Sequence, residues 1–272
     1  MTKPTYSAIG DIGLDIYPNI GKHFPGGMAL NSAYHAQRLG AISSVVSAIG
    51  DDINGKELIE FLDLSYISIE GLEIIHGKTD SVKITLDEYA RPQYGTWNLG
   101  VLEKFRLTSA QKQYLQTQDI AVAVHLPELR SMFNDFAKLH LSNTLKVGDF
   151  TDLSEYGGNQ EILKEYKNSF DIFALSIDEK VDTRLNTFQS FINKEKKIGI
   201  ALLGERGSAV FPHGKKYVYP AEKVSVVDTT GAGDAYLATF LVEYYHDQDI
   251  SSAMGKATQK ASIVIQTYGA VA

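Results

Sequence analysis

The sequence has no cysteine, only one tryptophan and no apolar run long enough to cross a bilayer. Without cysteine the protein can form no disulfide bond, no thiolate metal site and no cysteine nucleophile. The first ten residues also lack the apolar core of a signal peptide, and a transmembrane helix would need about 20 consecutive apolar residues. We therefore expect a soluble protein that acts in the cytoplasm and does not contact a membrane.

Positive charge is scarce as well, since 26 lysine and arginine residues stand against 33 aspartate and glutamate residues, for a net charge of -7. No basic block offsets this excess, so nucleic acid and acidic membrane surfaces are not expected partners. Any anionic ligand must be held by a local arrangement of groups. The seven histidines show no paired ligand spacing. We expect neither a structural metal site nor a histidine-based triad, and we expect most histidines at the surface.

The chain does have enough apolar residues, 44% of 272, to bury one large α/β core. From residue 108 onward, short apolar strands alternate with helical stretches, which predicts a mostly parallel sheet with helices on both faces. The predicted strands cover residues 120–124, 145–150, 172–175 and 198–203, followed by a hairpin of 209–211 with 216–219 and helices at 232–245 and 251–266.

The most informative stretch runs from Val226 to Tyr236, where an apolar strand end turns through two glycines into a helical pattern. Gly231 and Gly233 have no Cβ to keep a ligand from the backbone, and their amides stand at a helix N-terminus that favours an anion. Asp234 would lie beside that anion. A carboxylate there suits a base that takes a proton from a nucleophile attacking the anion. The alternative is an ordinary glycine-rich turn with an acidic residue in the first helical turn.

Two features near the start of the chain suit a polyhydroxylated ligand. Strand alternation places Asp11 and Asp15 on one face, where carboxylates can accept hydrogen bonds from neighbouring hydroxyls. The alternative is a solvated strand face. Next, Gly26 and Gly27 begin a helical pattern that carries Asn31 in its interior, where asparagine costs helix propensity. A simple turn would use the two glycines equally well.

The segment Asp-Thr-Thr-Gly-Ala-Gly-Asp at 228–234 resembles the C-terminal signature of the ribokinase-like (PfkB) family of sugar and nucleoside kinases. Gly26 and Gly27 with Asn31 resemble its N-terminal signature, Gly-Gly-x-x-x-Asn. The resemblance implies a single ribokinase-like α/β domain over residues 1–272, with a three-layer α/β/α fold, a mostly parallel central sheet and a small β-sheet lid. It also implies an ATP-dependent kinase that phosphorylates a sugar hydroxyl.

The same resemblance implies roles for individual residues. Asp234 would be the base, and the amides of Gly231, Ala232 and Gly233 would stabilise the charge of the transferred phosphoryl group. Because a helix N-terminus lowers the pKa of a carboxylate, we expect Asp234 to be ionised at neutral pH. Sugar binding would involve Asp11, Asp15, Gly26, Gly27 and Asn31. Nucleotide binding would involve Ser176, Leu203, Gly204, Gly207, Thr230, Gly231 and Gly233.

Some of these assignments stay open. At residues 176–179 the family carries Asn-x-x-Glu, which positions Mg²⁺ and phosphates; here Glu179 matches and would serve the metal, whereas Ser176 replaces the asparagine. The Leu-Gly-x-x-Gly segment at 203–207 is equally compatible with a plain turn between strands. Magnesium is expected because it bridges nucleotide oxygens, and a requirement for a monovalent cation such as K⁺ is left open.

The lid would be built from about residues 11–24 and 80–99, in which 81–87 and 93–97 have the pattern of two strands about a turn. Small sheets with open edges are marginally stable and expose groups that pair with other strands. We therefore expect the lid to pack against a second copy of the chain and form a homodimer.

Within the family, the chain is similar to bacterial fructosamine kinases in its segments 10–18 and 100–107. This implies a sugar-amine adduct such as fructoselysine as substrate, phosphorylated on its 6-hydroxyl. Such a substrate adds a cationic amine to a sugar, which Asp11 could bind as a carboxylate, or Tyr94 and Trp97 as aromatic faces. The alternatives are ribokinase, fructokinase or nucleoside kinase activity and, from another class, a catalytically silent sensor of sugar or nucleotide.

Overall fold

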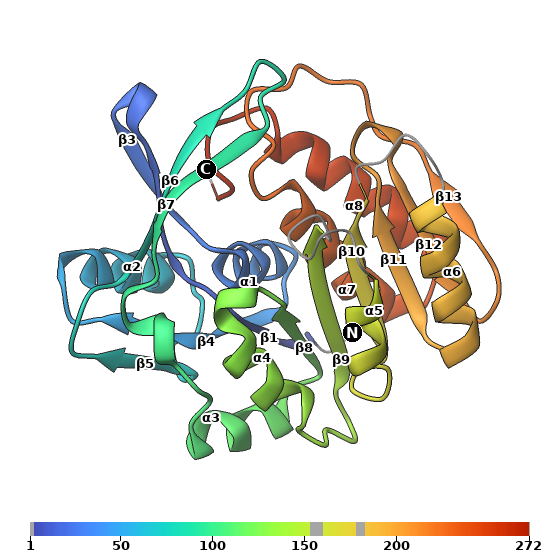
Figure 1. Cartoon of the computed structure of the whole chain (residues 1–272), viewed down its shortest axis with the longest axis horizontal. Helices are drawn as coiled ribbons and strands as arrows, with labels where there is room; N and C mark the ends of the chain where they lie inside the picture. The colour runs from blue at the N-terminus through green and yellow to red at the C-terminus, as the bar shows by residue number, and fades with distance from the viewer. Residues whose placement is uncertain (1–2, 153–159, 178–182, 272) are drawn as a thin grey trace.

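The computed structural model describes residues 3–152, 160–177 and 183–271, and within these a nine-stranded sheet forms the centre of the protein (Figure 1). From edge to edge its strands are β13 (Tyr217–Tyr219), β12 (Ser208–Pro212), β11 (Ile198–Leu202), β10 (Ile172–Ser176), β9 (Leu145–Asp152), β8 (Ile120–Val124), β1 (Thr5–Ile9), β4 (Ile42–Gly50) and β5 (Leu72–Ile75). Neighbours from β5 to β11 run parallel, and β12 and β13 add an antiparallel edge. The predicted mostly parallel sheet is confirmed.

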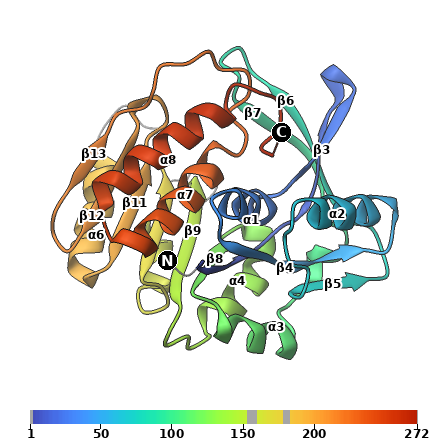
Figure 2. The ribbon, with the colours of Figure 1, turned by 180° about the vertical axis from the view of Figure 1, so that it is seen from behind.

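Helices cover both faces of this sheet, as Figures 1 and 2 show from opposite sides. One face carries α1 (Met28–Arg38), α2 (Ile53–Leu64), α7 (Ala232–Asp247) and α8 (Ile250–Val264), and the other carries α3 (Ser109–Tyr114), α4 (Arg130–Ala137), α5 (Glu161–Glu165) and α6 (Thr183–Glu195). Strands alternate their side chains between the two faces, so each face has its own apolar core. The expected three-layer α/β/α fold is confirmed.

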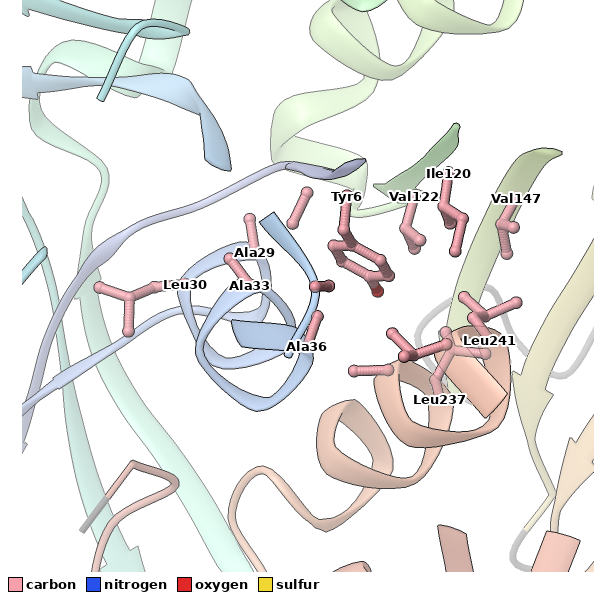
Figure 3. Close-up of a cluster of buried hydrophobic side chains, with 14 of the residues drawn as sticks. Tyr6, Ala29, Leu30, Ala33, Ala36, Ile120, Val122, Val147, Leu237 and Leu241 are labelled. Atoms are coloured by element: carbon pink, nitrogen blue, oxygen red, sulfur yellow. The ribbon is translucent and has the colours of Figure 1, made fainter. Parts of the chain in front are cut away.

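The core between the sheet, α1 and α7 brings two distant helices together. Figure 3 shows Tyr6 of β1 and Val122 of β8 beside small residues of α1 and leucines of α7, among them Ala33 and Leu237. The buried Tyr6 hydroxyl pairs with the Ser32 hydroxyl at 2.6 Å. Burying a large apolar side chain contributes about 1.5–3 kcal/mol. This core therefore fixes α1 and α7 relative to each other, so that the residues near their N-terminal ends are in contact.

A second, smaller sheet stands next to the N-terminal end of α1 (Figure 1). Its strands, in order, are β3 (Lys22–Gly26), β2 (Gly13–Tyr17), β6 (Asp80–Leu86) and β7 (Pro92–Asn98). β2 runs antiparallel to β3 and parallel to β6, and β6 runs antiparallel to β7. The lid strands predicted within 11–24 and 80–99 thus form one sheet. Asp11 lies ahead of β2, in the connection from β1.

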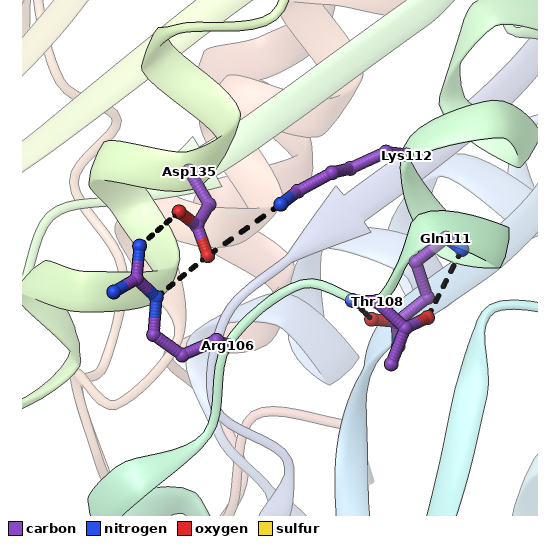
Figure 4. Close-up of polar contacts among 5 residues, drawn as sticks. All are labelled: Arg106, Thr108, Gln111, Lys112 and Asp135. Carbon is purple, nitrogen blue, oxygen red and sulfur yellow. Dashed lines mark hydrogen bonds and ion pairs between the residues drawn. The ribbon is translucent and has the colours of Figure 1, made fainter.

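Polar contacts anchor the segment that follows β7 to the main body (Figure 4). Arg106 donates from Nε to Asp135 of α4 at 2.9 Å and contacts the second carboxylate oxygen as well, and Lys112 Nζ lies 3.9 Å from the same group. Thr108 and Gln111 form a capping box at the start of α3. Asp135 is buried, so these partners compensate a charge that would be costly alone.

One expectation about the fold is wrong, and one strand was not predicted. The stretch Val226–Val227 is not the end of a strand; the Val227 amide instead donates to the Ile265 carbonyl, just after α8, at 2.8 Å. The sequence pattern also missed β5, whose residues are exposed or half-buried and show little apolar contrast. Most described histidines are exposed or half-buried, as expected, but His35 and His125 are buried. None of the helices in the described ranges has the length and apolarity that a membrane crossing requires.

Candidate active site

Two helix N-termini lie together at one edge of the central sheet, each preceded by a glycine with positive φ. Gly27, with φ 92°, caps α1, and Gly231, with φ 74°, caps α7. A Cβ on Gly27 would lie 2.6 Å from the Asp11 carbonyl oxygen, and one on Gly231 would collide with Ala270. Glycine is therefore required at both positions. Helix N-termini present unpaired N–H groups, so this edge is suited to an anion.

One hydrogen bond joins the two signature helices. Asn31 of α1 donates from Nδ2 to Oδ2 of Asp234 of α7 at 2.8 Å, across 203 residues of sequence. Both side chains are buried, and Asn31 Oδ1 has no hydrogen-bond partner. Leaving a buried acceptor unpaired costs about 1–3 kcal/mol. A ligand hydroxyl donating to Asn31 would remove that cost, so the pair has the features of a site for a polar ligand.

Three further aspartates in or next to the second sheet are buried: Asp11, Asp15 and Asp80. Desolvation raises the pKa of Asp11 to about 6. Desolvation, followed by the charges of Asp11 and Asp228, raises the pKa of Asp15 to about 7. Desolvation, followed by the charge of Asp11, raises the pKa of Asp80 to about 8. The predicted Asp11 and Asp15 therefore do share one site, and Asp80 joins them without having been predicted.

The expectation that the helix N-terminus lowers the pKa of Asp234 is wrong. Its pKa is raised well above the ordinary value, first by desolvation and then by the charges of Asp149, Asp11 and Asp15, and the hydrogen bond from Asn31 opposes this only in part. Burial among carboxylates thus outweighs the helix N-terminus. The resulting proton affinity suits a group that accepts a proton late in a transfer.

A buried network that the sequence did not reveal fixes the loop before α7. Tyr17 of β2 donates its hydroxyl to Asp228 Oδ2 at 2.6 Å, and the Gly269 amide donates to the same oxygen at 3.1 Å. Thr230 donates its amide at 2.9 Å and its hydroxyl at 2.6 Å to Asp228 Oδ1. Tyr17 and Asp228 are 211 residues apart, so the sequence contained no sign of their contact beyond the presence of Asp228 in the signature. The network ties the second sheet to the glycine loop.

The turn between β6 and β7 reaches the same loop. Thr229 donates its amide to the Ala90 carbonyl at 3.0 Å, and its hydroxyl lies 3.4 Å from the same oxygen. The second sheet therefore contacts the loop before α7 at two places, through Tyr17 and through Ala90.

Tyr94 and Trp97 lie on one face of the second sheet because β7 contains a bulge. The β6–β7 register shifts so that Val82 pairs with Trp97 and Ile84 with Tyr94. Residues three apart in a regular strand face opposite sides of the sheet. The bulge adds one residue to β7 between Trp97 and Tyr94, so both side chains lie on the same face. Tyr94 is 63% exposed, yet the pKa of its hydroxyl is raised by the surrounding protein and then by carboxylates, led by Asp15. The exposed Tyr94 is thus within electrostatic reach of the acidic cluster.

Part of the predicted nucleotide set gathers at the carboxyl ends of β10 and β11. Ser176 pairs with Leu202 across these strands, and a Cβ on Gly233 would lie 3.3 Å from Leu202 Cδ1. Ligands of parallel α/β sheets collect beyond such strand ends. Ser176 is half-buried there, beside the strand whose Leu202 approaches the glycine loop.

The turn after β11 is closed on itself. The Leu203 amide donates to the Gly207 carbonyl at 2.8 Å, and Gly204 and Gly207 have φ values of 57° and 91°. These contacts explain the two glycines as parts of a tight turn, so the geometry fits the plain-turn alternative as well as a nucleotide contact. Glu179, the predicted metal ligand, lies outside the described residues. In the ranges that the structure describes, no group of three or more histidine, aspartate or glutamate side chains could hold a metal ion.

Known proteins are similar to this chain over most of its length. The model of the pfkB family of carbohydrate kinases matches residues 15–126 and 163–272. A fructoselysine 6-kinase of Shigella flexneri is 29% identical over 266 residues, which cover 98% of this chain and 99% of the relative. A ribokinase of Bacillus subtilis is 26% identical, with 90% of this chain and 83% of the relative covered. The structure of Arabidopsis thaliana ribokinase complexed with ribose and ATP superposes with a TM-score of 0.82 at 21% identity, covering 99% and 95% of the two chains.

Proposed function

Because the chain belongs to the pfkB family of carbohydrate kinases, and is therefore a phosphotransferase that acts on a hydroxyl group with ATP as co-substrate, we propose that it is a fructosamine 6-kinase. It would transfer the γ-phosphate of ATP to the 6-hydroxyl of a sugar-amine adduct such as fructoselysine. The observation that carries this substrate is the match with a fructoselysine 6-kinase over 98% of this chain and 99% of the relative. Family membership favours an active kinase over a silent sensor.

The sugar binds where buried oxygen atoms lack partners. Asp11 Oδ1 and Asn31 Oδ1 are buried and accept no hydrogen bond, and both can accept from sugar hydroxyls. A Cβ on Gly26 would collide with the Asp15 carboxyl group, so the glycine leaves that carboxylate free to reach the ligand. Gly27 keeps the start of α1 close to Asp11 in the same way.

Asp234 acts as the base. It accepts the proton of the 6-hydroxyl as the new bond from that oxygen to the γ-phosphorus forms and the bond from the γ-phosphorus to the departing ADP oxygen breaks. Asn31 holds the carboxylate by the 2.8 Å hydrogen bond to Oδ2, so Oδ1 remains available for the proton. A base with a raised pKa binds that proton more tightly than an ordinary aspartate.

Backbone amides at the start of α7 stabilise the negative charge that spreads over the transferred group. Within the described residues, the amides of Gly231 and Gly233 donate no hydrogen bond, whereas the Ala232 amide donates to the Thr229 carbonyl at 3.3 Å. The two glycine amides are thus the better donors for the phosphoryl group, and Ala232 contributes mainly through the helix N-terminus.

A magnesium ion would enter with ATP, held by phosphate oxygens, water and one or two carboxylates, as is usual for this ion. Among the described residues no group of three or more such side chains could hold the ion, so Glu179 remains the proposed protein ligand. The ion would supply positive charge at the phosphates. Assays with EDTA, and with K⁺ replaced by choline, test the requirement for Mg²⁺ and for a monovalent cation.

Assembly and location complete the proposal. We infer a homodimer in which the second sheets of two copies pack together, because strands β3 and β7 leave its edges open. Because ATP is the co-substrate, we place the enzyme in the cytoplasm, and fractionation of cells that express a tagged chain tests this location.

The substrate is tested by comparing kcat/KM values in a coupled ADP-release assay with fructoselysine, fructose, ribose and a nucleoside. We expect a preference of at least tenfold for fructoselysine, which corresponds to about 1.4 kcal/mol of transition-state discrimination. A smaller preference would refute the fructosamine assignment. The activity would then be that of a ribokinase, as in the Bacillus subtilis relative, a fructokinase or a nucleoside kinase.

A further inference from the structure

The strand register aligns Asp80 with the sugar-binding face of the second sheet. Asp80 of β6 is the register partner of Gly13 of β2, and Asp15 of β2 is the partner of Val82. Alternate residues of a strand share a face, so Asp80 lies on the same face as Asp15. Gly13 has no side chain between them, and a Cβ there would lie 3.0 Å from the Asp80 Cβ. The glycine thus leaves the Asp80 carboxylate open toward Asp15.

This acidic cluster contains carboxylate oxygens that are buried but not paired. Asp11 is 7% exposed, and its Oδ1 has no hydrogen-bond partner. Asp15 is 4% exposed and forms no side-chain hydrogen bond with another described residue. Among residues that the structure describes, none of Asp11, Asp15 and Asp80 forms an ion pair with a lysine, arginine or histidine. Buried carboxylates without a positive partner are costly, and a cationic ligand would reduce that cost.

Asp80 itself is held in place by an aromatic side chain. Trp97 of β7 donates from Nε1 to Asp80 Oδ1 at 2.6 Å. This bond orients the carboxylate and leaves Oδ2 for a second donor. The β7 bulge therefore places Trp97, which orients Asp80, on the same face as Tyr94.

Asp80 and Asp234 belong to different parts of the site. Asp80 begins β6 of the second sheet, opposite Gly13, whereas Asp234 lies in the first turn of α7 and is bonded to Asn31 of α1. A sugar whose reacting hydroxyl is at Asp234 would direct its far end toward Asp80. In a fructosamine, the 6-hydroxyl and the amine on C1 are at opposite ends of the sugar.

We propose that Asp80, oriented by Trp97 and supported by Asp11, binds the secondary ammonium group of the sugar-amine substrate and makes the enzyme selective for it over neutral sugars. This inference rests on the proposed function. The ammonium carries one positive charge and two N–H donors. One N–H group would bond the second oxygen of Asp80, and the other would bond the unpaired oxygen of Asp11. A neutral sugar brings no charge and leaves the cluster uncompensated.

The test compares two substrates of the same shape and two variants of the same chemistry. N-propyl fructosamine carries the ammonium, and 1-O-propyl fructose replaces it by a neutral ether oxygen. Asp80→Asn removes the buried carboxyl group, and Asp63→Asn removes an exposed one on α2 as the matched control. We expect Asp80→Asn to lower kcat/KM for the amine about 10- to 100-fold, the range expected for a hydrogen bond to a charged group. The value for the ether should change less than about threefold, and Asp63→Asn should change neither.

Equal losses on both substrates, or no loss on the amine, would overturn the role of Asp80. If Asp80→Asn fails to fold, Trp97→Phe serves instead, because it removes the Nε1 donor and keeps the ring; it must show the same selective loss, at a few-fold. Failure of the proposed function is seen separately, in the unmodified enzyme, as a preference for fructosamines below tenfold. An enzyme that prefers the amine but does not lose this preference in Asp80→Asn would refute the inference alone.

Discussion

Replacement of the proposed base, Asp234→Asn, should separate catalysis from stability. Asparagine keeps the shape and can still accept the hydrogen bond from Asn31, but it cannot take the proton of the substrate hydroxyl. A positioned base contributes about 10²- to 10⁴-fold to rate, so kcat should fall by that factor, which corresponds to about 2.7–5.5 kcal/mol of activation free energy. ADP release under saturating ATP and substrate measures the loss.

The structure also gives the sign of the effect on stability. The pKa of Asp234 is raised above its unfolded value, mainly by desolvation, so its ionisation destabilises the fold as pH rises above that unfolded value. The Asp234→Asn variant should therefore be as stable as the unmodified protein or more stable at pH 7–8. For a chain of this size each 1 kcal/mol gained raises Tm by about 2–4 °C. At a pH below the ordinary pKa of aspartate, where both forms are neutral, the difference should vanish.

These two readouts together decide whether the reasoning holds. Near-normal turnover would remove Asp234 from the mechanism. A lower Tm at neutral pH would show that its charge is stabilised in the fold, contrary to the raised pKa. Asp63→Asn, an exposed change on α2, is the control for a general effect of losing one negative charge.

Three other predictions follow from contacts around the site. Asn31→Ala removes the donor that lowers the pKa of Asp234, so the acid limb of the profile of kcat/KM against pH should move to higher pH. If the limb lies at the same pH in both proteins, it reports the ionisation of another group. Tyr17→Phe removes the buried hydroxyl bonded to Asp228 at 2.6 Å and should lower the free energy of unfolding in urea by about 1–3 kcal/mol, with an unchanged value contradicting the network. Sedimentation velocity should show a dimer, and a monomer at all concentrations would refute pairing through the second sheet.

The sequence predicted best what local pattern determines. The succession of short, mainly apolar stretches and helical stretches from residue 108 onward located β8, β9, β10 and β11. Asn31 and Asp234 were predicted from short glycine-containing motifs, and their side chains do meet in the structure. The hydrogen bond between them could not be predicted, since it depends on how α1 and α7 pack across a shared core.

The rest depends on tertiary surroundings that a sequence does not display. Asp80 begins an ordinary alternating strand, and only its register with Gly13 places it on the face that carries Asp15. The pKa of Asp234 was misjudged because the helix N-terminus is a local feature, whereas desolvation depends on everything packed around the group. Val226–Val227 has strand propensity but finds the Ile265 carbonyl rather than a neighbouring strand.

The contact between Thr229 and Ala90 has a consequence for turnover. It closes the second sheet onto the glycine loop through one hydrogen bond at 3.0 Å and a weaker one at 3.4 Å, and each such bond contributes only about 0.5–1.5 kcal/mol net. Breaking both therefore costs about 1–3 kcal/mol, so roughly one molecule in six to one in 160 has both contacts open at any moment. Most molecules therefore keep the turn between β6 and β7 joined to the loop before α7, while a minority has it open, as the entry of substrate and the release of product require.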